Sequence, residues 1–459
     1  MHSAFAPASS VSIPLELVTA GEFDGWIGTQ DERTRDYLKS MGFKADIGRW
    51  AFVPSTDAGP GRVCAGAGDG KDPFLMATLP GLLPEGDYRL ERCPPDQDPV
   101  VLALGWADGA YRFTRYRRRT DAQPRLVLPL PGLTTERDLA DMLRQAEAID
   151  HLRDLINTPP CDMGPSEIER ECRQAAAEFG ASIEVSSGPD LEAGYPMVHA
   201  VGKGAEQAPR YIEMTWGRKD APVLALVGKG VAFDTGGLNI KTSGMGLMKK
   251  DMGGAAHALA LARLVMGASL DVRLVLAIPT VENAIGSRAF RPSDVLRSRK
   301  GLTVEVEDTD AEGRLILGDA LARVCELKPD LLIDFATLTG AARVALGPDL
   351  APLYTDDESL AEEILSASKS VGDPVWRMPL WAGYEAGLRS HVADMKNLGD
   401  GPMGGSITGA LFLKRFVDTS RWAHFDIWGW RPARYGRPPG AAACGLRAVW
   451  SVLRKRYGG

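Results

Sequence analysis

The sequence lacks the features that mark disulfide-bonded, membrane-spanning and secreted proteins. Its six cysteines lie far apart and form no C-x-x-C pair, so they predict reduced thiols rather than a disulfide framework or a zinc knuckle. No stretch reaches the roughly 18 uninterrupted apolar residues of a membrane-spanning helix. Residues 1–11 have neither the basic start nor the apolar run of a signal peptide. We therefore expect a cytoplasmic protein without a membrane partner.

An excess of positive charge is also missing. The formal charge of −7 provides no overall basic field for nucleic acid or anionic lipid. One local exception is the arginine-rich run at residues 112–119, which has two aromatic residues interleaved and could contact nucleic acid. In an acidic chain, a solvated face or a subunit contact is the better interpretation of this run. We expect no nucleic-acid partner.

Three common catalytic signatures are absent as well. The sequence has no H-E-x-x-H zinc motif, no glycine loop that continues into the Lys-Ser or Lys-Thr of a phosphate-binding loop, and no G-x-G-x-x-G dinucleotide fingerprint. These absences argue against a histidine-based zinc peptidase, a nucleoside-triphosphatase and a dinucleotide-dependent oxidoreductase.

What is present is enough apolar sequence for a large folded core. The chain has 459 residues, of which 44% are hydrophobic, and this length predicts two to three domains. Residues 1–135 alternate short apolar runs with turn-rich loops, which favours a small α/β domain. In it we expect strands at 12–18, 50–54, 99–105 and 125–129, and a helix at 31–41. Residues 136–157 carry helical apolar spacing and predict a connecting helix, which leaves 158–459 as the catalytic domain.

The larger domain repeats a pattern of strand, loop and helix. We expect strands at 222–227, 272–279, 303–306 and 331–335, and helices at 253–266 and 314–325. Near-continuous apolar strands separated by helices are typical of a mainly parallel sheet flanked by helices. Ligands of such sheets bind beyond the carboxyl ends of the strands. Polar clusters follow three of these strands, so we expect the site there.

Three glycine-rich segments carry the candidate chemistry: 228–237, 249–254 and 308–314. Together they bring the carboxylates of Asp234, Asp251, Asp310 and Glu312 to one crevice. Buried charges of one sign are costly unless they are paired or bound to metal. Two divalent cations would neutralise these four, and two metals close together can sharpen a shared hydroxide as a nucleophile.

These three segments resemble the signature of the leucyl aminopeptidase family, the M17 type of dinuclear metallo-aminopeptidase. The resemblance extends from about residue 157 to the C-terminus and is loose over the first 135 residues. It implies five metal ligands: Lys229, Asp234, Asp251, Asp310 and Glu312. Lys229 would bind metal as the neutral amine, and Asp234 and Glu312 would contact both metals. A free substrate amine would fill an open metal position, which restricts cleavage to the N-terminal residue.

The resemblance also implies catalytic and substrate-binding residues. Lys241 would stabilise the oxyanion that develops on the scissile carbonyl, and Arg314 would hold a bicarbonate ion that acts as general base. The side-chain pocket and its edge would be formed by Met248, Thr337, Leu338 and Gly340. Two departures from the family pattern are a loop one residue shorter between Lys241 and Asp251, and Asp308 in place of the usual asparagine.

The sequence therefore predicts a cytosolic metallo-aminopeptidase that acts on peptides, with a leucine-like preference possible. By resemblance we expect a homohexamer that uses zinc or manganese, with cobalt or magnesium as further options. Two alternatives stay open at this point: a catalytically idle relative that binds DNA or serves as a scaffold, and a two-metal hydrolase of phosphate esters. The retained ligands disfavour the first, and the lysine ligand with the lack of histidine disfavours the second.

Overall fold

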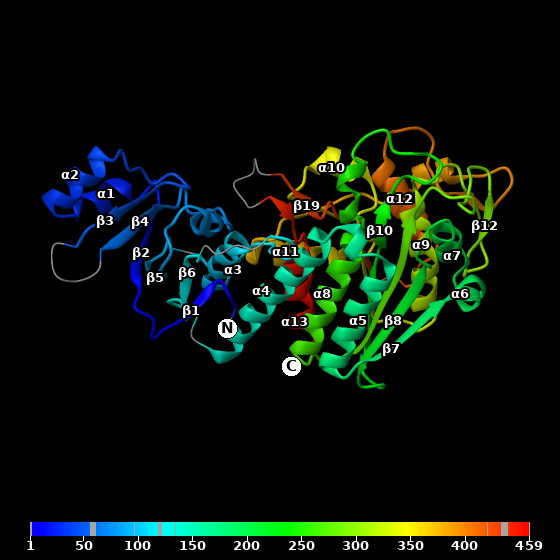
Figure 1. Cartoon of the computed structure of the whole chain (residues 1–459), viewed down its shortest axis with the longest axis horizontal. Helices are drawn as coiled ribbons and strands as arrows, with labels where there is room; N and C mark the ends of the chain where they lie inside the picture. The colour runs from blue at the N-terminus through cyan, green and yellow to red at the C-terminus, as the bar shows by residue number, and fades with distance from the viewer. Residues whose placement is uncertain are drawn as a thin grey trace. The chain divides into compact units, whose positions relative to one another are not determined.

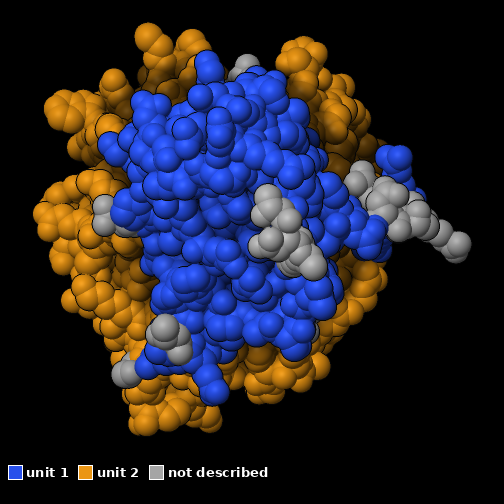
Figure 2. Space-filling view, turned by 90° about the vertical axis from the view of Figure 1, so that its left-hand side faces the viewer, with its two compact units in different colours: residues 1–150, 432–439 blue, residues 151–431, 440–459 orange. Residues whose placement is uncertain are grey.

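The computed structural model describes residues 2–55, 61–95, 97–117, 122–133, 135–419, 421–432 and 439–458. The chain, drawn in Figure 1, divides into two compact units. One comprises residues 1–150 and 432–439, and the other comprises residues 151–431 and 440–459 (Figure 2). None of the helices within the described ranges has the length and apolar character needed to cross a membrane. Part of the arginine-rich run, residues 118 and 119, lies outside the described residues.

The first unit is built on a six-stranded sheet in the order β1-β6-β5-β2-β4-β3. Its neighbouring strands are parallel except for β3 and β4. The elements are β1 (Phe5–Pro7), β2 (Ile13–Val18), α1 (Phe23–Gly28), α2 (Glu32–Ser40), β3 (Trp50–Val53), β4 (Arg62–Gly66), η1 (Leu75–Gly81), β5 (Asp87–Arg92), α3 (Pro99–Ala110) and β6 (Arg125–Leu128). The helix α4 (Glu136–Asn157) follows and begins in this unit.

One expected strand of this unit is wrong. Residues 99–105 open the helix α3, which is apolar nearly all round and buried. The Asp98 side chain accepts a hydrogen bond from the Val100 N–H and caps the helix, and Pro99 occupies its first turn, where a missing N–H costs nothing. The helix is twelve residues long, which is longer than most strands and suits a buried helix. The strands expected at 12–18, 50–54 and 125–129 and the helix at 31–41 are confirmed as β2, β3, β6 and α2.

The second unit holds a nine-stranded, mainly parallel sheet. Its order is β16-β15-β18-β14-β9-β11-β8-β7, and β10 pairs with β11. The strands are β7 (Ser182–Ser187), β8 (Arg210–Gly217), β9 (Val223–Gly228), β10 (Gly230–Asp234), β11 (Arg273–Asn283), β14 (Leu331–Ala336), β15 (Ala351–Tyr354), β16 (Val375–Arg377) and β18 (Trp422–Asp426). The central strands β11, β9, β14 and β18 run parallel to their neighbours in that series. This confirms the expected fold class.

Helices cover both faces of this sheet (Figure 1). On one face, α5 (Pro165–Phe179) and α8 (Gly253–Gly267) pack on the strands, and α13 (Leu446–Tyr457) packs on α8. On the other face, α7 (Pro196–Gly202), α9 (Glu312–Cys325) and α12 (Gly405–Lys414) share a buried apolar cluster with β9, β11 and β14. The other helical segments are η2 (Pro160–Asp162), α6 (Gly188–Gly194), η3 (Met245–Met252), α10 (Gly340–Leu346), α11 (Glu358–Ser370) and η4 (Ala382–Leu388).

The strand expected at 303–306 does not belong to the main sheet. It forms β13 (Thr303–Glu305), which pairs with β12 (Val295–Arg297) and β17 (Met395–Lys396) in a separate three-stranded sheet. Only Val304 of its three residues is buried, whereas interior strands of a covered parallel sheet are buried on both faces. A second small sheet pairs β19 (Trp430–Arg431) with β20 (Gly440–Ala441). The other strands and helices expected in this region are confirmed as β9, β11, β14, α8 and α9.

Candidate metal centre

The candidate residues lie at the ends of two strands of the sheet and on two helical segments. Lys229 directly follows β9, and Asp234 ends β10. Asp251 lies on η3, and Glu312 begins α9. Because parallel strands bring their carboxyl ends to one edge, these separate segments place their polar side chains together. The structure therefore brings the predicted residues together at this edge, and their role there stays a prediction.

Three of the four predicted carboxylates form one cluster. Asp234, Asp310 and Glu312 each offer an oxygen atom, and these atoms all lie within 4.8 Å of one another. Asp234 and Glu312 are buried. The fourth carboxylate, Asp251, is also buried and joins the cluster through Lys229.

Lys229 contacts two of the four carboxylates and the loop after β14. Its Nζ donates to Asp251 Oδ2 at 2.6 Å and to the Thr337 carbonyl oxygen at 3.1 Å, and lies 3.0 Å from Glu312 Oε1. The buried stem of Lys229 crosses Gly313 so closely that a Cβ there would lie 2.3 Å from Lys229 Cε. Only glycine leaves room for this lysine beside Glu312.

The second lysine contacts the other side of the cluster. Lys241 Nζ lies 2.7 Å from Asp234 Oδ2 and also donates to Asp310 Oδ1. Its side chain is mostly buried. Lys229 and Lys241 thus face four carboxylates. With Lys250, whose Nζ lies 3.8 Å from Asp251 Oδ1, three ammonium groups still leave one negative charge in excess.

Burial and the crowding of carboxylates shift the pKa values of this cluster. Burial and the neighbouring Asp234 carboxylate raise the pKa of Asp310 to about 7 and that of Glu312 to about 8. Burial alone would lower the pKa of Lys229, but the Asp251 and Glu312 carboxylates outweigh it and raise that pKa. A cation bound beside these two carboxylates would offset both effects and favour their ionised forms.

The donor set fits a divalent metal. Both oxygens of Glu312 are buried, and neither has a hydrogen-bond partner among the described residues. The 3.0 Å approach of Lys229 to Oε1 is an ion-pair contact without hydrogen-bond geometry. Buried carboxylate oxygens nearly always have partners, and carboxylates are the ligands that hard divalent cations prefer. A cation bridging Glu312, Asp234 and Asp310 would satisfy them.

Arg314 lies two residues after Glu312 in the first turn of α9 and has a second unsatisfied group. Its Nη1 donates to the Asn397 carbonyl oxygen at 2.8 Å, whereas its buried Nε has no partner among the described residues. A buried guanidinium N–H without an acceptor suits a small anion such as bicarbonate.

The predicted pocket residues lie on two different segments, the loop after β14 and η3. Thr337 Oγ1 donates to Asp251 Oδ1 at 2.8 Å and so contacts one of the candidate metal ligands. Leu338 lies in the same loop, and Gly340 begins α10. Met248 is buried on η3, three residues before Asp251. The loop after β14 therefore contacts the candidate ligand Asp251 through Thr337. Met248 is linked to Asp251 by its position on the same helical segment, η3.

Sequence reasoning missed the residues that hold these ligands in place. Asn283, the last residue of β11, donates to Asp234 Oδ1 at 2.8 Å and to the Thr309 carbonyl oxygen at 3.0 Å. The Thr309 hydroxyl in turn donates to the Gly236 carbonyl oxygen. Asp308, the departure from the family pattern, accepts the Asp310 N–H at 2.8 Å and so stabilises this loop. A buried polar residue at the end of an apolar strand was the available signal for Asn283.

Lys250 is a further charged residue to which no role was assigned from the sequence. It is 2% exposed, and its Nζ lies 3.8 Å from Asp251 Oδ1. The ammonium group also lies 4.0 Å from the ring centre of Trp428, and the Arg343 guanidinium lies 4.1 Å from that same ring. Burial lowers the pKa of Lys250 to about 8. Trp428 thereby packs between the ligand segment and α10.

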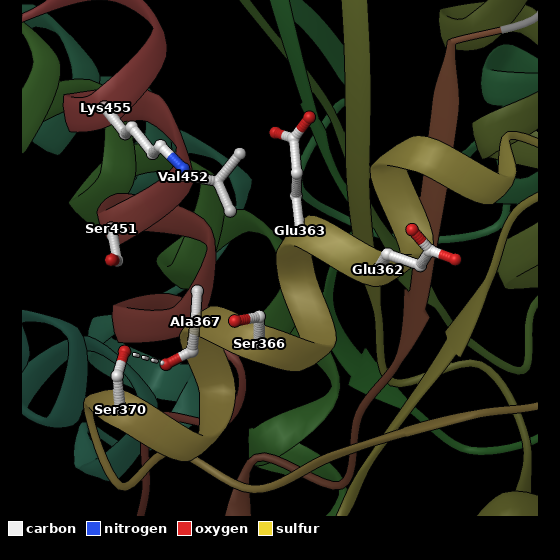
Figure 3. A pocket seen from close by; sticks show the side chains of 8 residues that line it. All are labelled: Glu362, Glu363, Ser366, Ala367, Ser370, Ser451, Val452 and Lys455. Carbon is white, nitrogen blue, oxygen red and sulfur yellow. Dashed lines mark hydrogen bonds between the residues drawn. The ribbon is translucent and has the colours of Figure 1, made fainter.

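A groove of about 350 Å³ lies elsewhere in this unit, between α11 and α13 (Figure 3). It is lined by Glu362, Glu363, Ser366, Ala367, Ser370, Ser451, Val452 and Lys455. None of these is a predicted site residue, and Glu363 is paired with Arg456 at 2.9 Å. The groove is separate from the metal cluster in its residues, and we assign it no catalytic role.

Comparison with known proteins decides the family. Residues 150–450 match the family model of the cytosol aminopeptidase family, catalytic domain, and residues 13–129 match that of the M17 aminopeptidase N-terminal domain. The chain belongs to the cytosol aminopeptidase (M17) family. It is therefore a metallo-aminopeptidase, a hydrolase that removes N-terminal residues from peptides. Family membership and the carboxylate cluster support two divalent metal ions per chain.

Individual cytosol aminopeptidases show how close the relationship is. A probable cytosol aminopeptidase of Roseiflexus castenholzii is 36% identical over 377 residues, which cover 78% of this chain and 77% of the relative. The crystal structure of the cytosol aminopeptidase from Coxiella burnetii matches with a TM-score of 0.93 and 43% identity, covering 99% of both chains. The bottromycin maturation enzyme BotP in complex with Mn matches with a TM-score of 0.85 and 31% identity, covering 97% of this chain and 99% of that one.

Proposed function

We propose that this aminopeptidase holds its two metals with Lys229, Asp234, Asp251, Asp310 and Glu312. One site would use Lys229, Asp251, Asp234 and Glu312, and the other would use Asp234, Asp310 and Glu312. The observation that carries the proposal is the buried Glu312 carboxylate. It has no hydrogen-bond partner among the described residues, although Asp234 and Asp310 oxygens lie within 4.8 Å of it. Contacts of Lys229 with both Asp251 and Glu312 support the first site.

The bound metals would polarise the scissile carbonyl group and lower the pKa of a water molecule. The chain's own residues then have separate tasks. Lys241 donates hydrogen bonds, and once its present partners Asp234 and Asp310 are engaged as ligands, its ammonium group is free for the carbonyl oxygen. Preorganised donors of this kind act on charge that develops in the transition state. Arg314, whose buried Nε has no partner among the described residues, would hold a bicarbonate ion, which would supply the general base.

The substrate would lie against the loop after β14 and against η3. Thr337, Leu338 and Gly340 lie on that loop and at the start of α10, and Met248 lies on η3. The hydrogen bond from Thr337 to Asp251 supports this placement, because it ties the loop to a metal ligand. Apolar Met248 and Leu338 favour a leucine-like first residue.

Further parts of the proposal rest on resemblance. Zinc or manganese is the expected metal, with cobalt or magnesium as alternatives; BotP was solved with Mn. We expect a homohexamer in the cytoplasm, with peptides as substrates and no nucleic-acid partner. Residues 158–459 would be the catalytic domain, 136–157 the connecting helix and 1–135 the N-terminal domain.

Metal analysis combined with an activity assay tests this function. The purified chain is expected to contain about two divalent ions and to hydrolyse a leucyl anilide, and both properties should be lost after dialysis against a chelator and return with added Mn²⁺ or Zn²⁺. Hydrolysis of leucyl anilide that survives complete metal removal would contradict the proposal.

A further inference from the structure

Asp426 is a buried carboxylate that the reaction described above does not use. It ends β18 and is 1% exposed. One of its oxygens accepts the backbone N–H groups of Leu338 at 3.1 Å and Thr339 at 3.0 Å. The other accepts the hydroxyls of Thr339 at 2.6 Å and Ser406 at 2.7 Å. Four hydrogen bonds thus join this carboxylate to the substrate loop and to α12.

The same loop is held from its other side by the metal-ligand set. Lys229 Nζ donates to the Thr337 carbonyl oxygen at 3.1 Å, and the Thr337 hydroxyl donates to Asp251. The Thr337 carbonyl and the Leu338 N–H belong to one peptide group, and in a trans peptide they point in opposite directions. This single peptide group therefore spans the distance between Asp426 and Lys229.

Helix α12 fixes Asp426 and the loop as one block. The Tyr354 hydroxyl donates to Ser406 Oγ at 2.6 Å, which directs the Ser406 hydroxyl to Asp426. Gly409 of α12 lies so close to the loop that a Cβ there would be 3.2 Å from Leu338 Cδ2 and 3.5 Å from Arg314 Nη2. The loop, Arg314 and α12 are therefore tightly packed at Gly409.

We propose that Asp426 is a positioning residue for catalysis: through the Thr337–Leu338 peptide group it sets the place of the substrate loop relative to Lys229 and its metal. The inference rests on the proposed function, because it assigns Asp426 a role at that same site. Without the carboxylate, two buried backbone N–H groups lose their acceptor, and the loop is fixed on the Lys229 side alone. A displacement of about 1 Å at a positioning element can reduce turnover roughly a hundredfold.

The test compares Asp426→Ala and Asp426→Asn with Asp373→Ala. Asp373 is a matched control, since it is also buried and accepts backbone N–H groups, those of Gly445 and Arg447 at the start of α13. For each variant we would measure metal content, thermal stability, and kcat and KM on leucyl, alanyl and phenylalanyl anilides.

We expect Asp426→Ala to keep its metals, to lose ten- to a hundredfold in kcat/KM, and to change the ratios among the three substrates. Asp426→Asn should fall between it and the wild type, because its amide oxygen still accepts both backbone N–H groups. Asp373→Ala should lose stability without any change in those ratios. A purely structural role would move stability alone.

Wild-type kcat/KM and substrate ratios in a metallated Asp426→Ala enzyme would overturn the proposal. If Asp426→Ala does not fold, Asp426→Asn and Ser406→Ala decide instead, and wild-type ratios in both would overturn it equally. A wild-type chain without metal or aminopeptidase activity would fail the proposed function, which is a different outcome.

Discussion

Lys229 Nζ lies 2.6 Å from Asp251 Oδ2, and both side chains are buried. The contact joins the residue that follows β9 to η3, two segments that are 22 residues apart in the chain. A buried ion pair of this kind does little for stability by itself. Its value lies in placing an amine and a carboxylate side by side where a metal can use both.

The two lysines of the site should fail in different ways. Lys229→Ala removes a neutral donor from the proposed ligand set, so we expect metal content to fall. Lys241→Ala removes a group that contacts carboxylates but is not a proposed ligand, so metal content should stay near wild type. Turnover should fall by about a hundred- to a thousandfold, the usual effect of losing one preorganised oxyanion donor, and KM should change less.

Metal analysis and steady-state kinetics on both variants check this prediction. Lys250→Ala is a useful companion, because Lys250 is a buried lysine beside Asp251 that has no assigned step. Near-normal kcat in a fully metallated Lys241→Ala enzyme would mean that another group supplies the oxyanion contact.

Removal of the metals should destabilise the chain. Ligands that bind only the native state stabilise it by mass action, by about 3 kcal/mol when the free metal is at a hundredfold its Kd. The carboxylates of Asp234, Asp310 and Glu312 would repel one another without it. We expect the Tm to fall in chelator and to rise with added Mn²⁺ in a concentration-dependent way. A Tm that changes neither in chelator nor with added Mn²⁺ would argue against a metal site in the folded core.

The strands and ligand segments were predictable because each carries a local signal. The apolar runs that became β9, β11 and β14 alternate with helices, and Asp234 and Glu312 stand in glycine-rich loops beside them. The strand predicted at 99–105 was wrong for a local reason too, because these residues form the start of α3. An apolar stretch alone does not separate a strand from a buried helix. The local signal for a helix is Asp98 followed by Pro99, since the Asp98 side chain caps the helix at the Val100 N–H, and the strand prediction overlooked it.

The supporting residues were not predictable in the same way. Asp426 and Asn283 act through partners that are 88 and 49 residues away in the chain. Nothing within a few residues of Asp426 reveals that the Leu338 N–H will point at it, because that depends on β18 pairing with β14. The alternation of strands and helices in the sequence indicates which loops lie at the same edge of the sheet. The hydrogen bonds between those loops depend on the register in which the strands pair, and the sequence pattern does not reveal that register.

His257 should make the fold sensitive to acid. Burial lowers the pKa of His257 to about 4, and the neutral ring donates from Nδ1 to the Gly253 carbonyl oxygen and accepts the Cys444 N–H at Nε2. The unfolded chain has the ordinary histidine pKa near 6.5. Its contribution is therefore complete above about pH 6.5 and is lost as the pH falls toward 4, by about 3 kcal/mol in all.

Urea unfolding at pH 7 and pH 4.5, in chelator, measures this loss. His257→Gln should lack the slope that the titrating ring provides, whereas His391→Gln, a change at an exposed histidine, should keep it. Equal loss of stability on acidification in the wild type and His257→Gln would show that His257 does not carry the effect.

Activity should require a free α-amine on the substrate. If the amine of the substrate fills a position on one metal beside Asp251, N-acetyl-leucyl anilide cannot make that contact and should be hydrolysed far more slowly than leucyl anilide. The comparison needs only the wild-type enzyme with both substrates at equal concentration. Equal rates would be inconsistent with an exopeptidase.

The metal content of Glu312→Gln tests the central claim most directly. Glu312 is buried, its oxygens have no hydrogen-bond partners among the described residues, and it is proposed to contact both metals. Elemental analysis of the purified variant should find both metals largely lost, and Glu362→Gln, an exposed change on α11, should keep the wild-type content. A Glu312→Gln chain that retains two tightly bound metals would contradict the account.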